Sequence, residues 1–210
     1  MRDSLRLIFI LALISAVAGG ALALVNSFTE PKIQAYQAQA EAVAYQGALS
    51  EANSFTSLPE LVEKVKSNPA TSNIEEIKAG LKNGSRVGWV CKVSVTGFSS
   101  KIAMLVGITN AGEIGETIIL EQTETPGLGS KITDPEFISQ SAIKNALPGE
   151  GLRVNKDNGS VQAVAGATIS SRAVVQGINQ VLQFYQNQSL AGPQDNKDQD
   201  IQAVTERESQ

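Results

Sequence analysis

The fold is decided by residues 87–120, which read VGWVCKVSVTGFSSKIAMLVGITNAGEIGETIIL. At the start of this stretch, every second residue is apolar and is expected to face the core: Val87, Trp89, Cys91, Val93 and Val95. A period of two predicts a strand with one buried face. Asn110-Ala111-Gly112 is typical of a hairpin turn between two further predicted strands, residues 103–108 and 114–120. The stretch therefore predicts an antiparallel meander, in which Cys91 is a core residue rather than a nucleophile.

Helices are predicted on both sides of this meander. Pro31 starts an apolar stripe at helical spacing that runs to about Ala48, and residues 58–62 are a second short candidate. Asp134-Pro135-Glu136 has the capping residue and the proline of a helix start. Asn158-Gly159 marks a turn into a predicted strand at residues 161–165. A last helix opens near Thr168 with one apolar face, formed by Val174, Ile178, Val181, Leu182 and Tyr185. The expected fold class is α+β, an antiparallel sheet with flanking helices.

Composition excludes several classes of function. The 210 residues include 17 Lys and Arg against 21 Asp and Glu, no His and a single Cys. A net charge of −4 is the wrong sign for binding nucleic acid, which needs a basic face. One Cys and no His exclude thiolate-held iron–sulfur clusters, C-x-x-C redox pairs and haem attachment. If this chain transfers electrons, it must therefore bind an organic cofactor. We assign it no metal site and no catalytic residue.

The N-terminal region can cross a membrane once. Residues 7–25 carry no charge over 19 positions, which is close to the length needed to span a bilayer as a helix. Arg2 and Arg6 precede this run, and no Lys or Arg follows before Lys32. The positive-inside rule therefore keeps the N-terminus in the cytoplasm and places the main domain outside. A cleaved signal peptide is the competing interpretation, because residues 21–23 have the small-x-small form of a cleavage site.

These observations divide the chain into four parts. We expect a cytoplasmic N-terminus and transmembrane anchor at 1–26, stalk and linker helices at 27–72, and the folded domain at 73–190. Residues 191–210 hold five acids, two bases and few apolar side chains, so they are expected to be a disordered acidic tail.

Two stretches have the composition of a binding site. Residues 121–131 (EQTETPGLGSK) leave a predicted strand as a Pro/Gly loop, where glycines allow backbone amides to approach a ligand. This loop does not have the spacing of a phosphate-binding Walker A motif, and an ordinary turn explains it equally well.

The second stretch is Ala165-Gly166-Ala167-Thr168-Ile169-Ser170-Ser171, at the start of the last predicted helix. Thr is a preferred N-cap residue, so a purely structural role explains Thr168 by itself. The same geometry also favours an anion, because free amides and the positive end of the helix dipole would meet three hydroxyl groups there. A hydroxyl held beside a phosphate could also be esterified by it.

Together, these features resemble the G subunit of the Rnf complex, the ion-pumping ferredoxin:NAD oxidoreductase of bacterial membranes. The resemblance covers residues 7–186 and rests on the single anchor, the segment Thr29-Glu30-Pro31-Lys32, the loop at 124–129, and Gly166-Ala167-Thr168 followed by two hydroxyls. It implies an FMN-binding domain that carries electrons on the outer side of the membrane, with FMN linked through its phosphate to Thr168. It also implies the other Rnf subunits as partners and an exported flavin transferase that makes this bond from FAD.

The resemblance assigns cofactor contacts residue by residue. Beside Thr168, they are Gly166, Ala167, Ser170, Ser171, Glu124, Thr125, Pro126, Gly127, Leu128, Gly129 and Lys131. The chain departs from the family pattern at Gln162, where Asp is usual, and at Ala165, where Ser or Thr is usual. Both departures bear on how readily the transferase modifies Thr168.

Three other interpretations stay open at this point. The chain is also similar to the C subunit of the sodium-pumping NADH:quinone oxidoreductase, a family whose chains tend to be longer. A stand-alone, membrane-anchored flavoprotein would carry flavin without a stable complex. A cofactor-free scaffold module would use Thr168 only as a helix cap. In the Rnf interpretation, enzymatic activity would belong to the complex rather than to the isolated subunit.

Overall fold

The computed structural model describes residues 2–190 and divides into two units, one ending at Val43 and the other beginning at Ala44. The predicted acidic tail lies outside the described residues. The first helix, α1 (Arg2–Ala48), contains a stretch, Arg6–Ile33, that is apolar and long enough to cross a membrane. This is consistent with a single-pass anchor. Pro31 lies inside α1 and does not start a new helix, because a proline removes one backbone hydrogen bond without always ending a helix.

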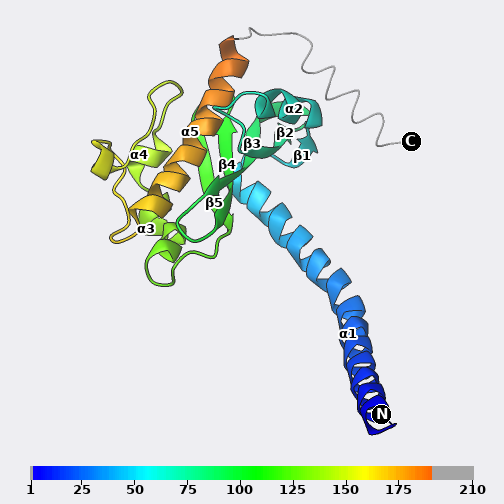
Figure 1. The fold of residues 1–210 in the computed structure, drawn as a ribbon. Helices are drawn as coiled ribbons and strands as arrows, with labels where there is room; N and C mark the ends of the chain where they lie inside the picture. Colours follow the sequence, from blue (N-terminus) through cyan, green and yellow to red (C-terminus); the bar gives the residue numbers. More distant parts are fainter. Residues whose placement is uncertain (1, 191–210) are drawn as a thin grey trace. The chain divides into compact units, whose positions relative to one another are not determined.

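The second unit is built on a five-stranded antiparallel sheet in the order β1-β2-β3-β4-β5 (Figure 1). The strands are β1 (Ser54–Ser57), β2 (Ile74–Lys82), β3 (Ser85–Thr96), β4 (Lys101–Thr109) and β5 (Ile114–Glu121). β3, β4 and β5 confirm the predicted meander. β1 and β2 were not predicted, although Asn83 and Gly84, both at positive φ, form the tight turn from β2 into β3. The short helix α2 (Pro59–Lys66) confirms the candidate at residues 58–62.

One face of the sheet is covered by α5 (Thr168–Leu190), which contacts β3 and β4. Four of the five residues predicted for its apolar face are buried: Val174, Ile178, Val181 and Leu182. Trp89 on β3 packs edge-on against Phe184 and Tyr185, while the Tyr185 hydroxyl donates to the carbonyl of Asn110. The predicted apolar face of this helix is therefore confirmed. Cys91 is fully buried in this core, and burial raises the pKa of its thiol, which keeps it protonated and unreactive.

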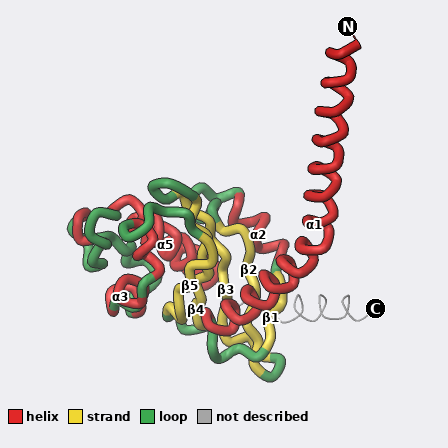
Figure 2. The backbone as a smooth tube through the Cα atoms, turned by 90° about the horizontal axis from the view of Figure 1, so that it is seen from below, coloured by secondary structure: helices red, strands yellow, loops and turns green. Residues whose placement is uncertain are grey.

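The opposite face of the sheet is also covered, so the prediction of a single buried face on β3 was wrong. Val90 and Leu105 form a second buried cluster with Tyr45, Leu49 and Ala52, which lie at and just beyond the end of α1. Figure 2 shows the end of α1 beside the strands. Gly107 and Gly115 let the sheet approach the Ala48 carbonyl so closely that a Cβ at either position would overlap this oxygen. Periodicity could not reveal this contact, because glycine carries no side chain to mark a buried face.

Residues 122–167 form the connection from β5 to α5 and contain only short helices. These are η1 (Gly129–Thr133), α3 (Pro135–Ile138), α4 (Ser141–Lys144) and η2 (Asn155–Asp157). The predicted helix start at Asp134-Pro135 is confirmed, although α3 has only four residues. The predicted strand at 161–165 is wrong. Only Val161 makes a bridge, to Val154, because the amides of Gln162, Ala163 and Val164 donate to side chains instead of a neighbouring strand.

Candidate functional site

The start of α5 leaves backbone donors free. The first helical hydrogen bond runs from the Ser171 amide to the Ala167 carbonyl at 3.0 Å, so Ala167 takes the capping position and Thr168 is the first helical residue. Among residues 2–190, the amides of Thr168, Ile169 and Ser170 donate to no acceptor. The half-buried Thr168 hydroxyl likewise has no hydrogen-bond partner among these residues. Thr168 is therefore adjacent to the cap rather than acting as the cap. These amides and the helix dipole create a positive end suited to an anion.

Gly166 and Ser171 shape the tight entry into α5. Gly166 has a φ of +76°, a conformation that residues with a Cβ rarely adopt. The Ser171 hydroxyl is buried, accepts from the Val164 amide at 3.0 Å and donates to the Ala167 carbonyl at 2.9 Å. Ser171 thus stabilises the backbone bend that presents Thr168.

Glu124 is a buried carboxylate of the site that accepts several hydrogen bonds. It is only 5% exposed, and its carboxylate accepts from the amides of Phe98, Ser99 and Ser100 at 3.2, 3.0 and 3.1 Å. The Ser170 hydroxyl donates to the same carboxylate at 2.7 Å. Burial by itself raises the pKa of Glu124, but these hydrogen bonds together lower it below the ordinary value, so the group is charged at neutral pH. Glu124 therefore joins three segments: the turn at 97–100, its own loop and the first turn of α5.

A cavity of about 520 Å³ opens between these segments. Eight of the predicted contacts line it: Glu124, Thr125, Leu128, Gly129, Gly166, Ala167, Thr168 and Ser170. Pro126, Gly127, Ser171 and Lys131 are not among the residues that line it. The two candidate stretches, about 40 residues apart in the sequence, therefore meet at one place.

Phe98 and Ile169 also line the cavity, although neither was predicted from the sequence. Phe98 is 66% exposed and Ile169 is 48% exposed. Phe98 lies between strands in the turn Gly97-Phe98-Ser99-Ser100, where an apolar side chain has no core to enter. The signal that could have identified Phe98 from the sequence is an aromatic residue within an otherwise polar turn.

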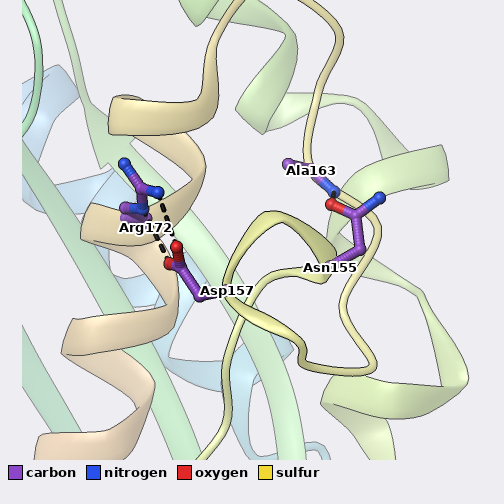
Figure 3. A network of polar contacts seen from close by, with 4 residues as sticks. All are labelled: Asn155, Asp157, Ala163 and Arg172. Atoms are coloured by element: carbon purple, nitrogen blue, oxygen red, sulfur yellow. Dashed lines mark hydrogen bonds and ion pairs between the residues drawn. The ribbon is translucent and has the colours of Figure 1, made fainter.

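The segment that leads to Thr168 is held by polar contacts (Figure 3). Two nitrogens of Arg172 on α5 donate hydrogen bonds to the Asp157 carboxylate, and Nε lies 2.7 Å from Oδ2. The hydrogen bond from Arg172 lowers the pKa of the exposed Asp157. The Asn155 side chain accepts from the Ala163 amide at 3.2 Å and donates to the Gln162 side chain at 2.8 Å. These contacts fix the path of residues 155–163 beside the first turns of α5.

The shape and chemistry of the cavity fit a phosphate attached to a large, flat aromatic ring. The polar end offers unpaired amides and the free Thr168 hydroxyl, while Phe98, Leu128 and Ile169 supply apolar surface. A cavity of this size falls in the range of small-molecule sites, about 300–1,000 Å³. A flavin mononucleotide combines both features, so the residues present fit that cofactor.

Comparisons with known proteins agree with this geometry. The FMN-binding domain family matches residues 97–183. The G subunit of the Na⁺-translocating ferredoxin:NAD⁺ oxidoreductase complex of Acetobacterium woodii is 37% identical over 188 residues, covering 86% of this chain and 90% of that protein. The G subunit of the ion-translocating oxidoreductase complex of Methanosarcina acetivorans is 30% identical, covering 87% of this chain and 95% of that protein.

Among solved structures, NqrC from Shewanella oneidensis overlaps 56% of this chain and 61% of its own, with a TM-score of 0.44 and 23% identity. The two relatives from A. woodii and M. acetivorans span nearly the whole chain. The chain therefore belongs to the family of G subunits of ion-translocating oxidoreductase (Rnf) complexes and contains an FMN-binding domain, which confirms the resemblance inferred from its motifs.

Proposed function

From this family membership, we propose that the chain is an electron-carrying subunit of a membrane-bound Rnf complex and holds FMN as a phosphate ester of Thr168. The observation that carries the proposal is the Thr168 hydroxyl. It is half-buried beside three unpaired amides, lines the cavity, and has no hydrogen-bond partner among residues 2–190. A simple helix cap would bond an amide of the first turn, which this hydroxyl does not do.

The residues of the site have separate roles in this proposal. The amides of Thr168, Ile169 and Ser170 hold the phosphate at the positive end of α5. Gly166 and Ser171 keep the bend that exposes Thr168. The bound FMN would supply the electron chemistry, which side chains alone do not provide. The charged Glu124, close to the site, would disfavour added negative charge and so lower the reduction potential.

Attachment balances as a transfer of FMN from FAD. The Thr168 oxygen forms a bond to the phosphorus on the FMN side of the pyrophosphate, the pyrophosphate bond breaks, and AMP leaves. The transferase takes up the proton of the hydroxyl. Gln162 and Ala165, the two departures from the family pattern, are both exposed, where they could contact the transferase. The Gln162 side-chain oxygen already accepts from Asn155, which fixes how the exposed side chain is presented.

The proposed location follows from α1. Its apolar stretch anchors the chain in the bacterial cytoplasmic membrane, and the basic residues before that stretch keep the N-terminus inside. The FMN-binding domain then lies on the extracytoplasmic side, where the other membrane and peripheral subunits of the complex would exchange electrons with it. Covalent attachment would prevent loss of the cofactor outside the cell.

Intact-protein mass spectrometry under denaturing conditions tests the proposal. The full chain, made in its native host, should gain the mass of one FMN minus one water. Thr168→Ala should abolish this gain. Thr123→Ala is the matched control, because Thr123 is an exposed threonine that does not line the cavity, and it should leave the gain unchanged.

The other outcomes separate the remaining interpretations. An unmodified but yellow protein would contradict the ester and indicate noncovalent flavin. An unmodified and colourless protein would favour the scaffold interpretation. A modified protein that never copurifies with membrane partners would indicate a stand-alone flavoprotein.

A further inference from the structure

Part of the cavity beside Thr168 is lined by apolar side chains that do not pack into the protein core. Phe98, Leu128 and Ile169 all line it and are 66%, 45% and 48% exposed. They come from three segments: the β3–β4 turn, the loop after β5 and the first turn of α5. Leaving such side chains in water forgoes the stabilisation that burial of their apolar surface would give. Three exposed apolar side chains around one cavity are therefore typical of a ligand surface.

The position of Phe98 depends on Glu124. The carboxylate accepts from the amides of residues 98, 99 and 100 in succession, so it fixes the backbone of the turn on both sides of the phenyl group. Gly97 allows this approach, because a Cβ there would overlap a carboxylate oxygen of Glu124. The turn is further closed by a hydrogen bond from the Gly97 amide to the Ser100 carbonyl at 2.8 Å.

Glu124 also ties this turn to the helix that bears Thr168. The Ser170 hydroxyl, 1% exposed, donates to Oε2 at 2.7 Å, while the Phe98 amide donates to the same oxygen at 3.2 Å. One carboxylate oxygen thus sets the spacing between Phe98 and the first turn of α5. Gly129 completes the arrangement, since a Cβ there would lie 2.8 Å from the Glu124 Cβ and 3.0 Å from Ser170 Oγ.

We propose that Glu124 is a positioning residue: by fixing the turn at 97–100 and linking it to Ser170, it holds Phe98 against the flavin ring. This inference rests on the proposed attachment of FMN to Thr168. The ring is large, flat and aromatic, and an aromatic side chain offers its faces a stacking surface that an aliphatic residue would not. Fixing the turn in advance also lowers the entropy cost of packing the ring.

The first test measures how accessible the flavin is to iodide in solution. Flavin fluorescence of the full chain, purified with its attached cofactor, is quenched with iodide in wild type, Phe98→Ala and Phe98→Tyr. We expect the quenching rate constant, which is the quenching constant divided by the unquenched fluorescence lifetime, to rise at least twofold in Phe98→Ala and to return to the wild-type value in Phe98→Tyr. Leu147→Ala is the matched control, because Leu147 is 48% exposed and lies outside this cavity, and it should behave as wild type.

The second test addresses Glu124. Glu124→Ala should raise the quenching rate constant toward that of Phe98→Ala and speed hydrogen exchange at the Ser99 and Ser100 amides. Ser170→Ala removes only the link to α5 and provides a milder variant if Glu124→Ala does not fold. It should raise the quenching rate constant by a smaller factor without changing exchange at the turn. If both variants carry FMN and are quenched like wild type, the positioning role of Glu124 is wrong.

Mass spectrometry of the same samples separates this inference from the proposed function. A wild-type chain without FMN overturns both. A wild-type chain with FMN, together with a Phe98→Ala variant that carries FMN and is quenched to the same extent, overturns only the role of Phe98.

Discussion

The two faces of the sheet are closed in different ways. On the α5 face, aliphatic side chains such as Ile178 and Met104 are fully buried and interlock with their neighbours. On the opposite face, Gly107 and Gly115 admit the Ala48 carbonyl into near contact with the sheet backbone. Side chains on the first face can change rotamer to accommodate a small change in volume. On the second face, backbone atoms contact backbone atoms directly, so an added side chain has no such room. The site lies at the edge of the adjustable face, where α5 begins.

The largest effect is expected on the α5 face. Ile178→Ala removes a fully buried side chain and should lower the free energy of unfolding by about 2–5 kcal/mol. Denaturation of the full chain in detergent, followed by the fluorescence of Trp89, measures this because Trp89 packs against α5. Gln176→Ala, at an exposed position of the same helix, should change stability by no more than about 0.5 kcal/mol. Equal effects of the two variants would contradict the packing described for this face.

The second prediction compares a glycine from each face. Gly107→Ala forces a Cβ against the Ala48 carbonyl and should cost about 1–3 kcal/mol. Gly177→Ala overlaps the terminal methyl of the buried Met104, which can shift more readily than a backbone carbonyl, and alanine favours the helix by up to about 1 kcal/mol, so it should cost less than Gly107→Ala. The same denaturation experiment measures both. The contrast between the two faces would be lost if Gly177→Ala proved as damaging as Gly107→Ala.

The smallest effect concerns pH and the Glu124 contact at the site. Its pKa in the folded chain is lowered from 4.5, so the unfolded chain binds this proton more readily. The stabilisation from ionised Glu124 is therefore present above pH 4.5 and is lost as the pH falls through the lower, folded value. Glu124→Gln should make unfolding less dependent on pH in this acidic range. An unchanged pH dependence would show that Glu124 does not stabilise the fold through its charge.

Eight of the ten residues that line the cavity were among the contacts assigned from the sequence, but the way in which they come together was not predictable. The loop at 124–129 and the segment at 166–170 each had a signal in glycine, proline and hydroxyl content. Nothing in their spacing indicated that Glu124 would bond Ser170, because a contact across 46 residues depends on how the chain folds between them. The strand predicted at 161–165 failed for the same reason, since side chains from elsewhere satisfy its amides.

Thr168 was singled out by the family resemblance. The sequence by itself determined the meander, the apolar face of the last helix and the single apolar stretch near the N-terminus. Each is a local pattern, set by the period of a strand or helix or by the composition of one segment. Only the tertiary structure decided that both faces of the sheet are covered, that Thr168 follows the helix cap, and that Phe98 joins the cavity. These depend on which distant backbone groups come within hydrogen-bond or van der Waals distance, and no local pattern encodes that.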